Sequence, residues 1–368
     1  MSDKKKIMAI VGTRPDAVKM CPLINELKKR EDFSVVVCAT GQHRELLSSV
    51  LDIFGVTPDY DLQIMQTEQD LFDITSRVMW GVKETLEAEH PDAILVHGDT
   101  TSAFGAALAA FYKKIPICHV EAGLRTYDIN APFPEEYNRR AIGLMAAYHF
   151  APTESAEKNL ISEGVDEFSV SVTGNTVIDA LSNTVRAGYR HPELDWAKGS
   201  RLILLTVHRR ESRGAAMRSI FSAVRRILEN YPDVKVIYPV HPNPVIADIA
   251  EEILGGCDRL HICAPLGVTD FHNFLSECYL ALTDSGGIQE EAAALGIPVL
   301  VTRNTTERQE GLLSGGMRLV GTGEGSVYRG VRELLENRAL YYAMSRAENP
   351  YGRGNACRNI SDIMRNII

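Results

Sequence analysis

The sequence lacks the cysteine pairs and long apolar runs of disulfide-rich, zinc-binding and membrane-spanning proteins. Its seven cysteines are scattered, and no two of them form a CxxC pair. Most lie inside apolar runs, so we expect reduced, buried thiols of a cytosolic protein. No apolar run is long enough to span a bilayer. The run after the charged N-terminal residues MSDKKK is too short for the core of a signal peptide.

Several common catalytic and nucleotide-binding motifs are also missing. We find no Walker A loop, no HExxH, no DxD-like metal pair in a suitable context and no GxSxG. The segment GTGEGS at Gly321 only loosely resembles a dinucleotide fingerprint and lacks the full spacing. These absences disfavour NAD-dependent oxidoreduction, metal-dependent hydrolysis and serine hydrolysis.

The chain carries no excess of positive charge, since its formal net charge is −9. A general surface for nucleic acid or an anionic membrane is therefore not expected. Any anionic ligand must be held by a local group of basic residues. The length of 368 residues suggests two domains, and 45% hydrophobic and 24% charged residues are ordinary for a globular protein.

What the sequence does contain is an alternation of short apolar runs with helical stretches. Near-continuous apolar runs separated by helices indicate parallel sheets covered on both faces, so we predict two doubly wound α/β halves. A helix is expected from about Asn175, and the polar stretch 189–201 is expected to be a loop. The predicted strands lie at 7–12, 34–40, 93–98, 116–121, 148–152, 170–174, 201–208, 234–241, 259–265, 279–284, 298–303 and 318–322.

Polar residues directly follow many of these strands, where ligands bind in such sheets. Arg14 and Lys19 lie near the start of a helix whose dipole would favour an anion, although a solvated basic pair fits equally well. The segment HRRES begins at His208 and brings two guanidinium groups that suit phosphate oxygens. Surface arginines in a loop are the alternative. His241 follows another strand, where a structural role is the commoner one.

The segment TDSGGIQEE is the strongest candidate for a phosphate-binding turn. Gly286 and Gly287 would let backbone N–H groups approach an anion, and Ser285 adds a hydroxyl. Glu291 falls one helical turn after Gly287 and could accept hydrogen bonds from a ribose diol. A simple tight turn followed by a solvated pair of glutamates is the alternative, and Glu290 has no assignable role.

Three acids of the first half are candidates for catalysis. Asp99 and Glu121 each end an apolar strand, and Glu135 lies in the segment APFPEEYNRR. Burying an ionised carboxylate at a strand end costs free energy, unless the carboxylate takes part in catalysis or pairs with a cation. Alternatively, Asp99 caps the helix that starts near Thr101, and Glu121 forms an ion pair with Arg125.

Eight segments, taken in order, resemble one family, the non-hydrolysing UDP-N-acetylglucosamine 2-epimerases. They are GTRPDAVKM, HGDTTSAF, HVEAGLRT, PEEYNRR, GNTVIDAL, HRRES, YPVHPNP and LTDSGGIQEEAAALGIPVLV. The resemblance implies two Rossmann-like domains of the glycosyltransferase-B type, with the active site in the cleft between them. It also implies that residues 1–173 and 355–368 form the domain with the catalytic acids and that residues 174–354 form the UDP-binding domain.

The resemblance implies that the chain interconverts UDP-N-acetylglucosamine and UDP-N-acetylmannosamine without metal, nicotinamide or other cofactor. In this family UDP is eliminated across C1–C2 to give 2-acetamidoglucal, and it then adds back with a proton on the opposite face. A hydrolysing relative that releases free N-acetylmannosamine, a glycosyltransferase of the same fold and a UDP-sugar sensor are the alternatives. The resemblance implies a homodimer as well, and the cysteine pattern and net charge lead us to expect a cytoplasmic protein that binds neither nucleic acid nor membrane.

The resemblance carries family roles onto individual positions of this sequence. It does not assign which acid removes the C2 proton and which returns it. The implied catalytic residues are Asp99, Glu121, Glu135 and His208, and the implied substrate-binding residues are Arg14, Lys19, Arg139, Phe271, Ser285, Gly286, Gly287 and Glu291.

Some family members bind a second UDP-N-acetylglucosamine as an activator. The residues implied for such a site are Gln42, Gln69, Arg209 and His241. Glu45 and Glu68 stand where activator-dependent members tend to have an uncharged or basic residue. Two further departures are Asp16 for a usual Glu and Gln309 for a usual Pro.

Overall fold

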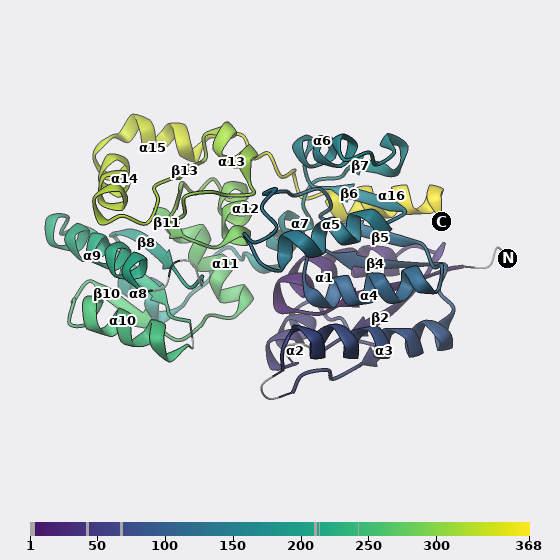
Figure 1. Cartoon of the computed structure of the whole chain (residues 1–368). Helices are drawn as coiled ribbons and strands as arrows, with labels where there is room; N and C mark the ends of the chain where they lie inside the picture. Colours follow the sequence, from purple (N-terminus) through teal and green to yellow (C-terminus); the bar gives the residue numbers. More distant parts are fainter. Residues whose placement is uncertain (1–3, 42–43, 67–68, 210–211, 213, 242) are drawn as a thin grey trace. The chain divides into compact units, whose positions relative to one another are not determined.

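The computed structural model describes residues 4–41, 44–66, 69–209, 212, 214–241 and 243–368. The chain forms two compact units, Met1–Asn183 with Tyr351–Ile368 and Thr184–Pro350. Most helices and many strands of each unit are labelled in Figure 1. Among the described residues, no helix is both long and apolar enough to cross a bilayer.

The first unit is built on a seven-stranded sheet in the order β3-β2-β1-β4-β5-β6-β7, and all neighbouring strands are parallel. The order reverses between β1 and β4, so the loops after these two strands lie at the switch point of the sheet. The strands are β1 (Lys5–Val11), β2 (Phe33–Ala39), β3 (Tyr60–Asp61), β4 (Ala93–His97), β5 (Ile117–Val120), β6 (Tyr148–Ala151) and β7 (Val170–Val172).

Helices cover both faces of this sheet. Met8 and Ile10 of β1 belong to the core beneath α3, α4 and α5, whereas Ile7 and Ala9, also buried, point to the other face because side chains alternate along a strand. On the second face α1 packs against α2 and α16. The helices are α1 (Arg14–Lys28), α2 (Arg44–Ile53), α3 (Leu71–Glu89), α4 (Thr101–Tyr112), α5 (Glu135–Met145), α6 (Glu154–Ser162), the 3-10 helix η1 (Glu167–Ser169), α7 (Thr176–Thr184) and α16 (Ala356–Ile367).

The second unit repeats this architecture on a six-stranded parallel sheet in the order β10-β9-β8-β11-β12-β13. The order reverses between β8 and β11, which are neighbours in the sheet, so the loops after these strands lie at its switch point. The strands are β8 (Arg201–Thr206), β9 (Val234–Pro239), β10 (Leu260–Cys263), β11 (Leu280–Thr283), β12 (Val299–Val301) and β13 (Met317–Leu319).

A large core cluster of this unit lies between the sheet and α9, α10, α14 and α15. Helix α9 packs against both α10 and α14, and α12 packs against α11 and α13. The helices are α8 (Pro192–Ala197), α9 (Ala215–Asn230), α10 (Pro244–Leu254), α11 (Val268–Glu277), α12 (Gly286–Ala294), α13 (Gln309–Ser314), α14 (Glu324–Glu336) and α15 (Arg338–Ser345).

The two parallel sheets with alternating helices confirm the predicted fold class. A strand overlaps each of the predicted strand ranges, with ends that differ by one to three residues in places, and the short edge strand β3 is an addition. The prediction that the polar stretch 189–201 is a loop was wrong, because it contains α8. His191 caps this helix by accepting a hydrogen bond from the Glu193 backbone N–H, and Pro192 presets the first turn.

Candidate functional site

Glu121 is held in an unusual backbone conformation at the end of β5. Its φ of 63° lies in the left-handed region, which is uncommon for a glutamate. The carboxylate pairs with Lys19 of α1 and accepts a hydrogen bond from Asn175 Nδ2 at 3.1 Å. Both side chains of the Lys19–Glu121 pair are less than one-tenth exposed. Strained conformations of this kind gather at functional sites, which makes Glu121 a candidate catalytic group.

The alternative partner of Glu121, Arg125, is engaged elsewhere. Its guanidinium donates two hydrogen bonds of 2.8 Å to the carboxylate of Glu163. The alternative of an ion pair between Glu121 and Arg125 was therefore wrong, and Glu121 pairs with Lys19, 102 positions away.

Asp99, which follows β4 after Gly98, is paired with Arg139 of α5. The Nε atom of Arg139 donates to Asp99 Oδ2 at 3.0 Å, and Nη2 contacts the same oxygen. Arg139 is fixed in turn by Glu136, whose Oε2 accepts from Nη1 at 3.0 Å. The capping role considered for Asp99 was wrong, because Thr100 is the N-cap of α4 and accepts from the Ala103 backbone N–H.

Arg14 and Glu135 stand at the first positions of α1 and α5. Both side chains are half-buried. The first unit thus brings Lys19 together with Glu121 and Asp99 together with Arg139. Arg14 and Glu135 lie at helix starts in the same unit.

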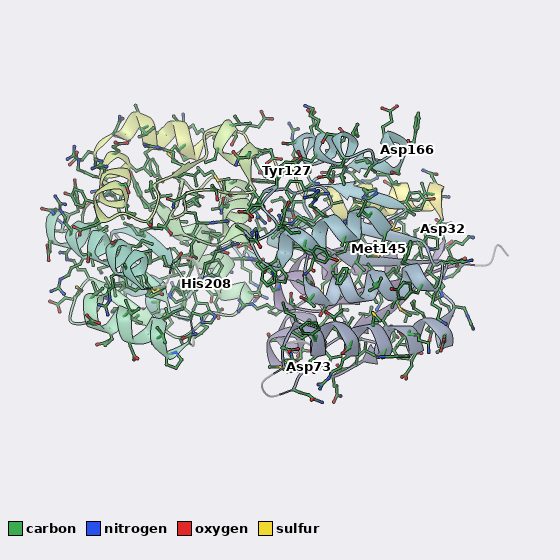
Figure 2. All side chains as sticks on the ribbon, viewed as in Figure 1. Asp32, Asp73, Tyr127, Met145, Asp166 and His208 are labelled. Carbon is green, nitrogen blue, oxygen red and sulfur yellow. The ribbon has the colours of Figure 1, made fainter. Side chains whose placement is uncertain are left out.

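His208 and Asp284 meet at the switch point of the second unit. Asp284 is fully buried, and its Oδ2 accepts hydrogen bonds of 2.9 Å from the backbone N–H groups of His208 and Arg209. The other oxygen of Asp284 lies 3.6 Å from His208 Nδ1. The imidazole of His208 (labelled in Figure 2) stacks on that of His241 with ring centroids 5.7 Å apart. Asp284 therefore positions the backbone of His208, a role that the sequence analysis did not foresee.

Ser285, Gly286 and Gly287, here called the glycine turn, lie where the chain passes from β11 into the first turn of α12. Ser285 occupies the N-cap position of α12, and its backbone N–H donates to Thr283 Oγ1 at 2.9 Å. The helix starts at Gly286, so backbone N–H groups and the positive end of the helix dipole are directed to this point. Such a turn can bind a phosphate group.

Arg308, which the sequence analysis missed, lies against the glycine turn. A Cβ atom on Gly286 would lie only 2.6 Å from Arg308 Nη1. The guanidinium is buried and pairs with Glu290 at 3.0 Å and with Glu307. Glu290, for which the sequence offered no role, thus anchors an arginine at the turn. Its separation of 18 positions from Arg308 left no local signal for this pair.

Several arginine side chains lie close to the carboxylate of Glu307. Burial alone would raise its pKa, but Arg308, Arg303 and Arg209 outweigh that effect and hold the pKa of Glu307 well below its usual range. The Arg209 Nη2 atom lies 3.9 Å from Glu307 Oε1. One residue of the implied activator site therefore contacts the carboxylate that holds Arg308.

Glu291 lies on the same face of α12 as Gly287, because a Cβ atom on Gly287 would be 3.6 Å from Glu291 Oε1. The other carboxylate oxygen is 3.7 Å from Nε2 of the buried His272. Phe271 on α11 is half-buried, whereas Phe274 is the phenylalanine of that helix that enters the core.

The remaining residues implied for an activator site are described in part. Gln42 lies outside the described residues. Gln69 accepts a hydrogen bond from the Gln66 backbone N–H at 3.0 Å, and the exposed His241 accepts one from the Asn243 backbone N–H at 3.2 Å. In the part of the chain that the structure describes, no group of three or more His, Cys, Asp or Glu side chains is placed to hold a metal ion.

Comparison with known proteins adds independent findings. The family model described as UDP-N-acetylglucosamine 2-epimerase matches residues 25–365. The UDP-N-acetylglucosamine 2-epimerase of Bacillus subtilis strain 168 is 50% identical over 357 residues, which are 97% of this chain and 94% of the relative.

Two solved structures are similar in fold as well. The S. aureus MnaA co-structure with UDP is 47% identical, with a TM-score of 0.95 and coverage of 99% of this chain and 96% of that one. The UDP-GlcNAc 2-epimerase of Neisseria meningitidis bound to UDP-GlcNAc is 41% identical, with a TM-score of 0.94 and coverage of 98% and 100%.

Proposed function

Since the chain belongs to the UDP-N-acetylglucosamine 2-epimerase family, we propose that it interconverts UDP-N-acetylglucosamine and UDP-N-acetylmannosamine without releasing free sugar. The observation that carries this proposal is the pair of oriented acids at the ends of neighbouring strands. Glu121 is fixed by Lys19, and Asp99 is fixed by Arg139. Both acids follow strands that pair in the same sheet.

Inversion at C2 requires two opposite proton transfers. The C2–H bond is not next to a carbonyl, so its proton is too weakly acidic for simple abstraction. Loss of UDP solves this problem: a carboxylate takes the C2 proton, the C2–H electrons form the C1=C2 bond, and the C1–O electrons leave with UDP. UDP then adds back to C1 while an acid delivers a proton to the other face of C2. Asp99, Glu121 and Glu135 are the proposed acids.

The proposed role of the second unit is to hold UDP. The backbone N–H groups of the glycine turn and the start of α12 would bind the diphosphate, together with His208. Arg14 and Lys19 add positive charge for the leaving group. Glu291 would accept hydrogen bonds from the ribose hydroxyls, and Phe271 would pack on uracil. The relative from Neisseria, bound to UDP-GlcNAc, supports this choice of ligand.

Incubation with UDP-N-acetylglucosamine in D2O, without any added cofactor, tests the proposal. We expect the manno epimer to appear and C2 to carry deuterium, both read by proton NMR, because the returned proton comes from solvent-exchangeable acids. An intact C2–H with no epimer would contradict the proposal. Free N-acetylmannosamine released in equal amount to UDP would instead identify the hydrolysing reaction.

The variant Asp99→Asn separates chemistry from binding. The amide keeps the shape of the side chain but cannot take or give the proton, so we expect kcat to fall by about 10²-fold or more. The affinity for UDP, measured by calorimetry, should stay within about threefold, since Asp99 is not among the residues proposed to hold UDP. Wild-type turnover in this variant would remove Asp99 from the proposed acids.

The family resemblance extends the proposal to assembly, regulation and location. We propose a homodimer and a second UDP-N-acetylglucosamine site that acts through Arg209, which contacts the carboxylate that holds Arg308. A cytoplasmic location agrees with the seven cysteines, all of which are free thiols.

A further inference from the structure

Glu136, the second residue of α5, is fully buried and accepts hydrogen bonds from two segments of the chain. Its Oε2 atom accepts from the Thr126 backbone N–H at 3.0 Å and from Arg139 Nη1 at 3.0 Å. Its Oε1 atom accepts from the Tyr127 backbone N–H at 3.1 Å. Donors of this kind compensate a carboxylate for the loss of water on burial. Glu136 therefore joins α5 to the loop that contains Thr126 and Tyr127.

That loop, residues 121–134 and here called the acid loop, begins with the candidate acid Glu121. Strand β5 ends at Val120, and Glu121 then takes its left-handed φ of 63°. Tyr127 (labelled in Figure 2) takes a second left-handed φ, of 62°. Neither residue is a glycine, so both conformations carry strain and persist only where the surrounding structure holds them. The hydrogen bond from the Tyr127 N–H to Glu136 is one such restraint on the acid loop.

Helix α5 also holds the other two candidate acids. Glu135 is its first residue. Asn138 Nδ2 donates to the backbone carbonyl of Asp99 at 2.9 Å, and Arg139 Nε donates to the Asp99 carboxylate at 3.0 Å. Asp99 is thus held by α5 through both its backbone and its side chain. A side chain that joins this helix to the acid loop can therefore set the position of one acid relative to the others.

The acid loop is also tied to α6, a helix that carries none of the proposed site residues. Asn159 Nδ2 donates to the Gly123 carbonyl at 2.9 Å. The Arg125 guanidinium donates two hydrogen bonds to Glu163, which directly follows α6. These contacts restrain the loop from one side, whereas Glu136 connects it to the helix that holds the other acids.

We propose that Glu136 is a positioning residue that keeps Glu121 at a fixed position relative to Asp99 and Glu135 during the two proton transfers at C2. This inference rests on the proposed function. The transfers occur on opposite faces of the sugar ring, so the acids must keep their distances from one carbon atom while UDP leaves and returns. Because its side chain is fully buried, Glu136 acts through the backbone and the arginine that it holds.

The variant Glu136→Gln keeps the length of the side chain but cannot satisfy all three donors. Its amide has one acceptor oxygen, so its NH2 group must face either the Tyr127 N–H or the donors from Thr126 and Arg139. A displacement of catalytic groups by about 1 Å can cost about 10²-fold in rate, so we expect kcat to fall about 10- to 100-fold. The Kd for UDP should stay within about threefold, because Glu136 is not among the residues proposed to hold UDP.

The fate of the intermediate distinguishes a positioning role from a loss of folded protein. In D2O, 2-acetamidoglucal and UDP either return to UDP-N-acetylglucosamine or go on to the manno epimer, and both sugars then carry deuterium at C2. The early ratio of deuterium in the two sugars, read by proton NMR, depends on the placement of the acids and not on the amount of folded enzyme. We expect Glu136→Gln to change this ratio by about threefold or more. A wild-type ratio would overturn the proposal.

Asp179→Asn is the matched control, because Asp179 also accepts two backbone N–H hydrogen bonds within the first unit. They come from Ala356 at 3.1 Å and Cys357 at 3.2 Å, at the start of α16. This variant should lose stability but keep the wild-type deuterium ratio. The same change of ratio in Asp179→Asn would show that any weakened contact in the unit has this effect, and would contradict the specific role of Glu136.

Tyr127→Gly tests whether Glu136 acts through the strained acid loop. Glycine adopts a left-handed φ without strain, so the loop should depend less on its bond to Glu136. Adding Tyr127→Gly to Glu136→Gln should therefore restore about threefold or more in kcat and return the deuterium ratio toward the wild type. Tyr127→Phe, which removes only the hydroxyl that donates to Asn159 Oδ1 at 3.1 Å, should not rescue. Equal effects of the two Tyr127 substitutions would contradict the proposed link.

Two further measurements keep the test decisive. If Glu136→Gln does not fold, Glu136→Asp takes its place, because the shorter carboxylate cannot reach both segments at once; a wild-type ratio in this variant would overturn the inference. Wild-type exchange at C2 in D2O is measured first. Its absence would contradict the proposed function, whereas an unchanged ratio in the variants of an active enzyme would contradict the role of Glu136 alone.

Discussion

At the scale of single residues, Gly286 shows how one missing Cβ atom shapes the proposed phosphate site. A Cβ atom there would lie 2.6 Å from Arg308 Nη1 and 2.9 Å from Glu307 Oε1. Arg308 cannot retreat easily, since it is buried and held by Glu290 and Glu307. We expect Gly286→Ala to lower the free energy of unfolding by about 2 kcal/mol through overpacking, and to weaken UDP binding. Denaturant unfolding and calorimetry measure the two effects.

Gly287 offers a control one residue along the same helix. A Cβ atom there would meet only Glu291 Oε1, at an ordinary contact distance of 3.6 Å. Gly287→Ala should therefore leave the free energy of unfolding unchanged or raise it by up to about 1 kcal/mol, because alanine favours the helix. Equal destabilisation of the two variants would show that contact with Arg308 is not the reason for glycine at position 286.

The candidate catalytic acids could be predicted from the sequence, because their role depends on their position at the end of a strand. Asp99 and Glu121 stood out because each follows an apolar run. Their partners were not predictable, because the sequence suggests neighbours such as Arg125, whereas the fold supplies Lys19 from 102 positions away. Arg308 was missed for the same reason.

At the scale of secondary-structure elements, strands β5 and β6 bury two histidines side by side. His119 and His149 pair in the register of these parallel strands, and both are almost fully buried. Burial lowers the pKa of His119 to about 3. Burial, helped by the charge of Arg125, lowers that of His149 to about 4. Both rings are therefore neutral in the folded chain across the physiological range.

These two histidines should make the first unit sensitive to mild acid. The unfolded chain binds protons at both side chains below pH about 6.5, whereas the folded chain does not until pH falls to about 4 or 3. Their contribution to stability is thus complete above pH about 6.5 and is lost as pH falls. Between pH 6.5 and 5 we expect a loss of about 2 kcal/mol for each histidine, measured by denaturant unfolding at several pH values.

The variant His149→Gln isolates one half of this effect, because glutamine does not titrate. We expect the pH dependence of the free energy of unfolding between pH 6.5 and 5 to fall by about half. A slope equal to that of the wild type would mean that His149 is protonated in the folded chain as well.

The helices and strands could be predicted from the sequence more completely than the ion-pair and hydrogen-bond partners of the side chains. Each predicted strand exists, because continuous apolar runs bounded by turn residues leave few alternatives. Helix α8 was missed because it is short, polar and defined by its cap at His191. Strand β3 has two residues, too few for any periodicity to appear.

At the scale of the whole molecule, the chain leaves the first unit after α7 and returns to it at Tyr351. Helix α16 then packs on α1, and its buried face includes Ile360 and Met364. Asp179 of α7 accepts hydrogen bonds from the Ala356 and Cys357 backbone N–H groups and so caps the start of α16. The last helix of the sequence is thus part of the core built by the first 183 residues.

This connection predicts that damage to the last helix destabilises the unit at the other end of the sequence. Ile360 is fully buried, so Ile360→Ala should lower the free energy of unfolding of the first unit by about 2–4 kcal/mol. Asp362→Ala is the control on the same helix, because its ion pair with Arg30 is half-exposed and should contribute less than about 1 kcal/mol.

Hydrogen–deuterium exchange read by mass spectrometry shows which unit the Ile360→Ala variant destabilises. Peptides of β1, β4 and β5 should exchange faster than in the wild type, while peptides of β8 and β11 keep wild-type rates. Faster exchange in the second unit alone would show that α16 does not stabilise the first unit, despite its packing on α1.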